Sequence, residues 1–221
     1  MEQYLLERLT REIKISALNI LRENAEISFL DKIAQSSLAK RLIFYGGTSL
    51  RLAYHSPRFS DDLDFLMVKK ITENELKNVI ELLILEEKNF SLKDIKEKRK
   101  TLFALLNLSH SSLKHPLNIK IEISKRKNGV KGEYLPLASS CSHLSPIILT
   151  ATIESMKKLK EEAIKGRTDS KDWFDLWYIS KYLKQPFVPP IKFPFQPKEF
   201  KRGLKRFLPQ NRWLLIDQIY V

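Results

Sequence analysis

Two adjacent glycines constrain the fold of this chain more than any other feature of its sequence. Gly46 and Gly47 follow a short apolar run at 42–45 and precede a stretch with helical spacing that begins with Thr48 and Ser49. Glycine adopts backbone dihedrals that other residues avoid, and a helix N-terminus exposes unpaired N–H groups. The segment therefore predicts a strand–turn–helix unit. Such a unit is either a cradle for a phosphate or a tight turn with a helix cap.

The rest of the sequence mixes strand and helix patterns in one chain. Further strands are predicted at 63–68, 101–109 and 117–124, and helices at 4–23, 28–40, 48–54, 73–87, 147–166 and 171–184. The uncharged stretch 134–153 contains two prolines and four serines, which favour a loop that leads into a helix. The expected fold class is α/β (α+β), with a small mixed sheet flanked by helices. We expect a core domain at 1–145 and a mainly helical region at 146–221, with a basic tail from about 181.

Charge and cysteine content limit the possible partners and compartments. The chain has 39 Lys and Arg against 26 Asp and Glu, a formal net charge of +13, which favours a polyanionic partner. Its one cysteine excludes an internal disulfide and a zinc site with several thiolates. Acidic residues near the N-terminus are unlike a signal peptide, and no stretch is typical of a membrane span. We therefore expect a cytoplasmic protein with no membrane partner.

Asp62 and Asp64 form the first acidic feature. They are two residues apart at the start of a predicted strand, so both carboxylates project from one face while Leu63 and Phe65 enter the core. Two carboxylates this close repel each other unless a cation lies between them. Hard oxygen ligands suit Mg²⁺ or Mn²⁺, which also bind substrate phosphates. The pair predicts either a metal site or a solvated acidic strand end.

Glu122 lies on the polar face of a strictly alternating segment, 117–124. Leu117, Ile119, Ile121 and Ile123 form one face, and Asn118, Lys120, Glu122 and Ser124 form the other. If this polar face also carries Asp62 and Asp64, Glu122 adds a third carboxylate to the metal site. Otherwise it lies on the wet face of an ordinary sheet.

A charged segment at 157–176 is the last candidate. Gly166 ends a basic helix, and Asp172 and Asp175 share one face of the next helix because they are three residues apart. Cations from this segment would neutralise a triphosphate if they lay near the metal site, and would otherwise cover a solvated helix pair. The sequence leaves the choice of lysine open among Lys157, Lys158 and Lys160.

Taken together, these segments resemble the AbiEii-type nucleotidyltransferase toxins of the DNA polymerase beta-like nucleotidyltransferase superfamily. Residues 46–52 resemble the GG[ST] motif of the family, and residues 58–65 resemble its R-x-S-x-D-L-D-F block. Residues 160–176 follow its lysine helix and [RK]-D-x-x-D-L pattern, with Lys171 where arginine is usual. The resemblance covers residues 44–176 and implies a nucleotidyltransferase fold.

The resemblance also implies a reaction, the metal-dependent transfer of a nucleoside monophosphate from an NTP to an acceptor hydroxyl. The residues it implies as catalytic are Asp62, Asp64, Glu122, Lys160 and Asp172, of which the first three would bind Mg²⁺ or Mn²⁺. The residues it implies for nucleotide binding are Gly46, Gly47, Thr48, Ser49, Arg58, Ser60, Lys160 and Asp175. The family further implies an antitoxin partner.

The acceptor is expected to be RNA, most simply tRNA, because relatives modify tRNA and this chain is strongly basic. Basic links at 96–100 and 125–127 and the tail, with nine Lys and Arg and two acids after residue 180, would contact phosphates. The aromatic residues of the tail either stack on RNA bases or fold back onto the core.

Two other functions are compatible with the sequence. The first is a non-catalytic nucleic-acid-binding protein with a degenerate nucleotidyltransferase fold, which would account for the charge alone. The second is a metal-dependent nuclease that uses Asp62, Asp64 and Glu122, which leaves the Gly46–Gly47 turn without a role.

Overall fold

The computed structural model describes residues 1–126 and 129–219 and contains one mixed seven-stranded sheet. The strands are β1 (Leu42–Tyr45), β2 (Asp62–Met67), β3 (Phe90–Glu97), β4 (Thr101–Leu108), β5 (Leu117–Ser124), β6 (Gly132–Pro136) and β7 (Ile147–Ala151). They run in the order β3-β4-β5-β2-β1-β7-β6. The predicted class, a mixed sheet flanked by helices, is confirmed.

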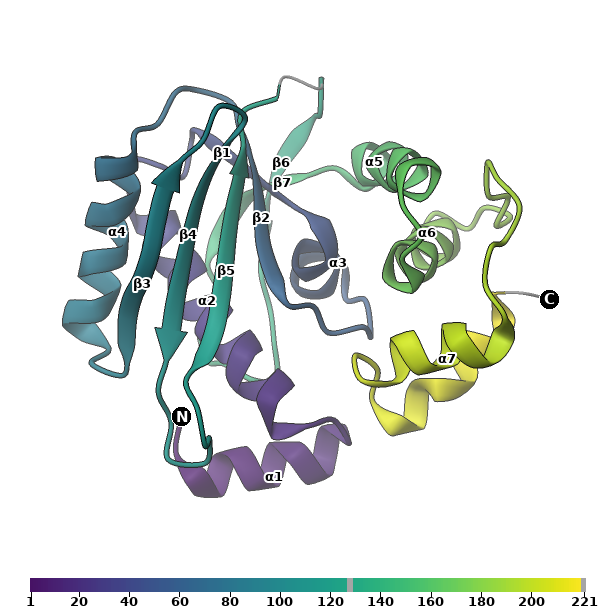
Figure 1. Ribbon diagram of the computed structural model, residues 1–221, viewed down its shortest axis with the longest axis horizontal. Helices are drawn as coiled ribbons and strands as arrows, with labels where there is room; N and C mark the ends of the chain where they lie inside the picture. The colour runs from purple at the N-terminus through teal and green to yellow at the C-terminus, as the bar shows by residue number, and fades with distance from the viewer. Residues whose placement is uncertain (127–128, 220–221) are drawn as a thin grey trace.

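The helices divide into those that cover the sheet and those that lie beyond its β2–β1–β7 side (Figure 1). They are α1 (Gln3–Ile13), α2 (Ala17–Gln35), α3 (Gly46–Tyr54), α4 (Glu73–Glu86), α5 (Ile153–Gly166), α6 (Ser170–Tyr182), α7 (Pro197–Lys205) and the 3₁₀ helix η1 (Gln210–Gln218). The apolar faces of α1, α2 and α4 bury the main core against β2, β4 and β5. Among the described residues, no helix is long and apolar enough to cross a membrane.

Strand pairing brings the predicted motifs together on neighbouring strands in the middle of the sheet. β1 pairs antiparallel with β2, which sets Tyr45 opposite Asp64 and leaves the Gly46–Gly47 turn directly beside that aspartate. β2 pairs parallel with β5, which sets Asp62 beside Lys120 and Asp64 beside Glu122. Since side chains two residues apart share a face, all four polar side chains project from the same face of the sheet.

The helix predicted at 4–23 is wrong in one respect, because it is two helices. Lys14 ends α1 in the left-handed conformation (φ 60°), and the Ser16 hydroxyl caps α2 by accepting from the Asn19 amide at 3.4 Å. The helix predicted at 28–40 is the second half of α2, which ends at Gln35. A stop signal without glycine or proline explains why spacing alone did not separate the two helices.

The loop predicted at 134–146 and the helix predicted to begin at 147 are partly wrong. Residues 132–136 and 147–151 form the antiparallel pair β6–β7, and β7 also pairs with β1 through Phe44 and Thr150. α5 begins only at Ile153, after the Thr152 side chain caps it. β7 thus brings the first residues of the predicted C-terminal region into the sheet. β3 was not predicted either.

The tail folds back onto the helices, which settles the two alternatives for its aromatic residues. Phe200 is fully buried, and Phe187, Phe193 and Phe195 pack with Trp173 and Phe174 of α6 in a second core. Trp213 joins the same cluster, and the Phe59 amide donates to the Phe207 carbonyl at 2.8 Å. The tail therefore packs against α6 and is hydrogen-bonded to the loop that follows α3.

Candidate active site

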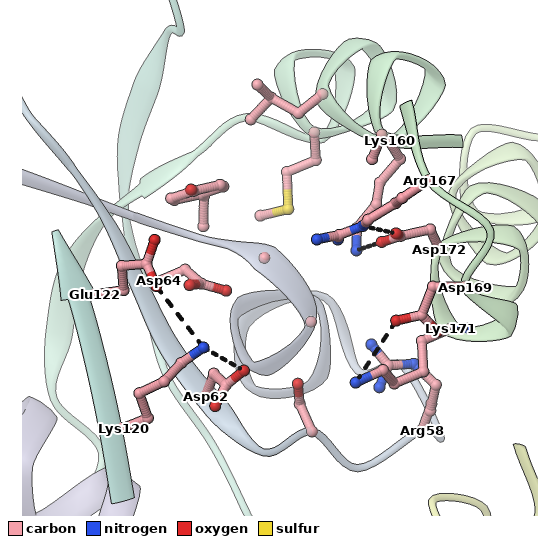
Figure 2. Close-up of a pocket in the computed structure, with 17 residues that line it drawn as sticks. Arg58, Asp62, Asp64, Lys120, Glu122, Lys160, Arg167, Asp169, Lys171 and Asp172 are labelled. Atoms are coloured by element: carbon pink, nitrogen blue, oxygen red, sulfur yellow. Dashed lines mark hydrogen bonds and ion pairs between the residues drawn. The ribbon is translucent and has the colours of Figure 1, made fainter. Parts of the chain in front are cut away.

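A polar cavity of about 250 Å³ lies between the β2–β5 face and the helices α5 and α6 (Figure 2). Its floor is the Gly46–Gly47 turn at the start of α3. The residues that line it are Tyr45, Gly46, Gly47, Arg58, Ser60, Asp62, Asp64, Lys120, Glu122, Met156, Leu159, Lys160, Ala163, Arg167, Asp169, Lys171 and Asp172. Segments more than 100 residues apart in the sequence thus meet around one space.

The two glycines of the floor are required by close packing. Gly46 has a φ of +88°, and a Cβ on it would lie 2.7 Å from Asp64 Oδ2. A Cβ on Gly47 would lie 2.6 Å from Ser60 Oγ and would also collide with the Arg58 guanidinium. Both distances are shorter than van der Waals contact allows. Any side chain here would push apart the polar groups that surround the turn.

The sheet side of the cavity carries the carboxylates. Lys120 Nζ lies 3.1 Å from Asp62 Oδ2 and 3.7 Å from Glu122 Oε2. Burial and the nearby Asp62 carboxylate raise the pKa of Asp64 to about 6, although Lys120 and Lys160 oppose the shift. We call these four residues, Asp62, Asp64, Lys120 and Glu122, the acidic wall. Its three carboxylates exceed its one cation.

The helix side carries an ion-pair network that is buried except for Arg167, and we call it the basic wall: Arg58, Lys160, Arg167, Asp172 and Asp175. Lys160 Nζ donates to Asp172 Oδ1 and lies equally close to Asp175 Oδ2, at 2.7 Å each. Arg58 donates two hydrogen bonds to the Asp175 carboxylate, from Nε at 2.7 Å and from Nη2 at 2.8 Å. Arg167 Nε donates to Asp172 Oδ2 at 2.6 Å.

The aspartates of the basic wall are held ionised by their partners. Burial alone would raise the pKa of Asp172, but Lys160 and Arg167 outweigh it and hold that pKa at about 2. Arg58 and Lys160 lower the pKa of Asp175 against its complete burial. Lys160 remains charged for the same reason, since Asp175 and Asp172 raise its pKa against the effect of burial.

Most of the predicted site residues line the cavity, but three do not. The Thr48 hydroxyl donates to the Asp62 carbonyl at 2.6 Å, which ties α3 to β2 from below. Ser49 is fully buried, and its hydroxyl has no hydrogen-bond partner among the described residues. Asp175 is fully buried behind Arg58 and Lys160 and is absent from the lining of the cavity.

Of the three candidate lysines, Lys160 is the one that faces this cavity. Lys157 donates to Gln185 Oε1 at 2.7 Å, and Lys158 borders a different depression near Thr152. The side chain of Lys160 is only 11% exposed, so the helix directs it inward along with Ala163.

Several lining residues were missed by the sequence analysis. Lys120 shares the polar face of its strand with Glu122, a signal that was visible, but its role needs the parallel β2–β5 register. Tyr45 ends β1 next to the glycines. Asp169 caps α6 through the Lys171 amide at 2.9 Å, and both residues reach the cavity from the turn between α5 and α6.

The donor set of the acidic wall fits a hard divalent cation in its chemistry. Carboxylate oxygens are the ligands that Mg²⁺ and Mn²⁺ prefer, and the excess of negative charge favours a cation there. Across residues 1–126 and 129–219, no three His, Cys, Asp or Glu side chains converge into a preformed metal centre. In this structure the Lys120 ammonium lies between Asp62 and Glu122.

A second, larger depression of about 660 Å³ adjoins the cavity and shares Arg167, Asp169 and Lys171 with it. Arg202 and Arg206 of the α7 region line its far side and are exposed. Within the part of the chain that the structure describes, no carboxylate lies in ion-pair distance of these two arginines. The lining of the depression holds four cations, Arg167, Lys171, Arg202 and Arg206, and two carboxylates, Asp169 and Glu199, so this surface is basic on balance and continues from the helix side of the cavity.

The described residues of the basic links predicted at 96–100 and 125–127 do not line the cavity. Lys125 bonds Glu97 at 2.7 Å and the Lys98 carbonyl at 2.8 Å, so it joins the β3–β4 turn to the end of β5. Lys127 lies outside the described residues.

Comparison with known proteins identifies this architecture. The sequence model of the family described as "Nucleotidyl transferase AbiEii toxin, Type IV TA system" matches residues 28–207. That match extends past the segment 44–176 on which the sequence resemblance rested and includes α7. No curated protein matches the chain significantly.

Solved structures share the fold at low sequence identity. JHP933 from Helicobacter pylori is 24% identical with a TM-score of 0.56, over 76% of this chain and 68% of that one. MenT4, the nucleotidyltransferase toxin Rv2826c from Mycobacterium tuberculosis H37Rv, is 18% identical with a TM-score of 0.63, over 91% and 68%. A further H. pylori structure, described as a nucleotidyltransferase, is 20% identical with a TM-score of 0.51, over 100% and 84%. The predicted nucleotidyltransferase fold is confirmed.

Proposed function

The chain belongs to the AbiEii nucleotidyl transferase toxin family and is a nucleotidyltransferase, and we propose that its charged cavity transfers a nucleoside monophosphate from an NTP to an RNA hydroxyl. One observation carries this proposal. Three carboxylates of the acidic wall face Lys160 and Arg167 of the basic wall across a glycine floor. A triphosphate with its cation needs both kinds of charge at once.

The triphosphate would lie over the Gly46–Gly47 turn. α3 begins at this turn, so its first N–H groups and the positive end of its dipole favour an anion there. The closeness of the turn to Asp64 supports the same reading, because only glycine lets the backbone approach so nearly. Lys160 and Arg167 would offset the negative charge of the β and γ phosphates.

The reaction is an in-line displacement at phosphorus. The acceptor oxygen forms a bond to the α-phosphorus, the bond from that phosphorus to the β-phosphate oxygen breaks, and pyrophosphate leaves with the electron pair. Asp62, Asp64 and Glu122 would hold Mg²⁺ or Mn²⁺, which when bound polarises the phosphate and lowers the pKa of the acceptor hydroxyl. The proton of that hydroxyl leaves to Glu122 or to solvent.

The residues of the basic wall have separate roles in this proposal. Asp172 keeps Lys160 charged and aimed into the cavity through the 2.7 Å hydrogen bond. Asp175 is a positioning residue, because it contacts Arg58 and Lys160 from behind without lining the cavity. Arg58 and Ser60 border Gly47 and would shape the nucleotide side of the cleft.

RNA is the acceptor that the surface charge favours. The basic depression that adjoins the cavity presents Arg167, Lys171, Arg202 and Arg206 in continuity with the reacting groups. Cationic side chains of this kind bind a phosphate backbone without reading its sequence. The end of a tRNA, which is single-stranded, would reach the α-phosphate from this side. The family further supports an antitoxin protein as a partner.

A labelling experiment tests the proposal. Purified protein is incubated with total tRNA, Mg²⁺ and each α-³²P NTP in turn. We expect label on RNA in one nucleotide reaction, lost in Asp62→Ala and kept in Asp61→Asn. Asp61 is a matched control because it pairs with Arg22 at 2.6 Å and does not line the cavity. Label on protein would mean that the acceptor is a protein and not RNA. Shortened RNA would indicate a nuclease. RNA binding without label would indicate a non-catalytic protein.

A further inference from the structure

Lys120 differs from an ordinary surface lysine because its ammonium lies among carboxylates inside the cavity. It projects from the middle of β5 into the cavity, with its ammonium between the carboxylates of Asp62 and Glu122 (Figure 2). Its side chain is 36% exposed, as is that of Asp62, so the group is neither buried permanently nor free in solvent. Strand pairing fixes this position, because the parallel register sets Lys120 directly beside Asp62.

The charges around Lys120 explain what it does in the protein without nucleotide. Asp62, Asp64 and Glu122 bring three negative charges to one face, and the cations of the basic wall are already paired with Asp172 and Asp175. Among the described residues, Lys120 is the cation within ion-pair distance of Asp62 and Glu122. It therefore relieves a repulsion that the three carboxylates would otherwise suffer.

We infer that Lys120 is a resident counter-ion that holds the acidic wall together without metal and makes divalent-cation binding depend on the arrival of the NTP. This inference rests on the proposed function. A divalent cation that enters alone must displace the ammonium or accept its repulsion. A cation that enters with a triphosphate brings compensating negative charge. The long, flexible lysine stem lets the ammonium then turn away from Asp62.

The size of the effect follows from Coulomb interaction. Two unit charges 4 Å apart in water-like surroundings interact strongly enough to change a binding constant several-fold, and a divalent ion doubles the energy. Removal of the Lys120 charge should therefore tighten the binding of a divalent cation about tenfold or more. A lysine with only a structural role would have the opposite effect on binding, because its loss would loosen the wall.

The test measures Mn²⁺ affinity on the full chain at pH 8 without nucleotide, by electron paramagnetic resonance and calorimetry. We expect Lys120→Met and Lys120→Gln to bind Mn²⁺ about tenfold more tightly than the natural protein. Lys120→Arg should behave as the natural protein because it keeps the charge. Lys88→Met, a change at an exposed lysine between α4 and β3, is the matched control and should have no effect. Two variants that lack the charge are measured so that the result does not depend on one that misfolds. Circular dichroism identifies a misfolded variant.

A second measurement separates this inference from the proposed function. In the natural protein a non-hydrolysable NTP should increase Mn²⁺ affinity, and in Lys120→Met that gain should shrink. If Mn²⁺ affinity is unchanged or weaker in both variants that lack the charge, the inference is overturned, whatever the protein does with NTPs. If the variants bind Mn²⁺ more tightly but no NTP binds to any protein, the counter-ion role stands, whereas the dependence on NTP and the transfer reaction both fall.

Discussion

The two walls of the cavity solve the problem of concentrated charge in opposite ways. The basic wall pairs its cations with aspartates that are buried, since Asp172 is 1% exposed and Asp175 is fully buried. The acidic wall leaves Asp62 and Glu122 partly exposed, at 36% and 42%, and sets one lysine against three acids. One wall is complete without a substrate. The other is short of positive charge until a cation arrives.

This difference separates the residues that maintain the fold from those that await a ligand. In the basic wall, removal of Asp175 leaves the buried Arg58 charge without its partner, so the cost falls on stability. In the acidic wall, removal of a carboxylate relieves repulsion, so the cost falls on activity alone. Substitutions on the two sides should therefore give opposite signs in the free energy of unfolding.

The largest effect is expected at Asp175. Asp175→Ala leaves the Arg58 guanidinium buried without its bidentate partner, and we expect a loss of about 3–5 kcal/mol in the free energy of unfolding. Denaturant unfolding followed by circular dichroism measures it. Glu12→Ala, which removes an exposed ion pair with Arg8, should change stability by less than about 0.5 kcal/mol. Equal losses in the two variants would show that burial of Arg58 and Asp175 adds nothing to the cost.

At Asp64 the effect should appear in activity instead. Asp64→Asn should lower nucleotide transfer by a factor of about 10²–10³, because a carboxylate at the reacting centre is lost. The same change should raise the free energy of unfolding by about 1–2 kcal/mol. The sign follows from the raised pKa of Asp64, about 6, because ionised Asp64 costs the folded state stability at neutral pH. A variant that is both inactive and less stable would argue against this assignment.

Lys160 lies between these extremes. In Lys160→Met, Asp172 keeps Arg167 and Asp175 keeps Arg58, so the protein should remain folded. Transfer should fall about 10²-fold through the loss of charge at the phosphates. Steady-state kinetics on labelled NTP measures it, with Lys157→Met as a control on the same helix because Lys157 contacts Gln185 outside the cavity. Similar losses in both variants would place the phosphates elsewhere.

The effect of pH distinguishes the walls further. Mn²⁺ affinity should fall up to about tenfold for each pH unit below 6, because protons compete for Asp64, whose pKa is about 6. The basic wall should not change in this range, since the pKa of Asp172 is about 2 and its contribution to stability is lost only as the pH falls toward that value. Calorimetric titrations between pH 5 and 8 test it. Affinity that is constant across this range would refute it.

The fold class followed from the sequence because it depends on local spacing. Alternation at 62–64 and 118–124 is enough to predict which side chains share a face. The burial of a side chain, by contrast, does not follow from local spacing. Asp172 and Asp175 share a helical face, yet only the packing of α6 against Arg58 and the aromatic tail shows that Asp175 is buried. Lys120 likewise needed the β2–β5 register, which no local pattern encodes.

The missed strands have a similar physical cause. β7 is preceded by prolines and serines that favour a loop, and its strand character comes from pairing with β6 and β1, which are distant or irregular in sequence. Tertiary pairing decides such segments. Spacing therefore misassigns 147–151 to the helix that follows, although its β-branched residues favour a strand, and succeeds at 117–124, where alternation is strict.

The smallest effect is expected at Arg167. Its side chain is 64% exposed, so Arg167→Ala should change the free energy of unfolding by less than about 0.5 kcal/mol. Because it borders both the cavity and the basic depression, the KM for the RNA or the NTP should rise a few-fold while kcat changes little. A fall in kcat equal to that of Lys160→Met would show that it contacts the reacting phosphate directly.

The packing of the aromatic tail against α6 has a consequence for the biosynthesis of the protein. Translation completes the acidic wall once β5 is made, but Lys160 and Asp175 follow later, and Phe193 and Phe200 later still. Domains form as their residues emerge from the ribosome. A growing chain that already carries Asp62, Asp64 and Glu122 still lacks the aromatic residues of the tail that pack against α6. The cavity is therefore completed only late in synthesis, when the C-terminal segments that support α6 have been made.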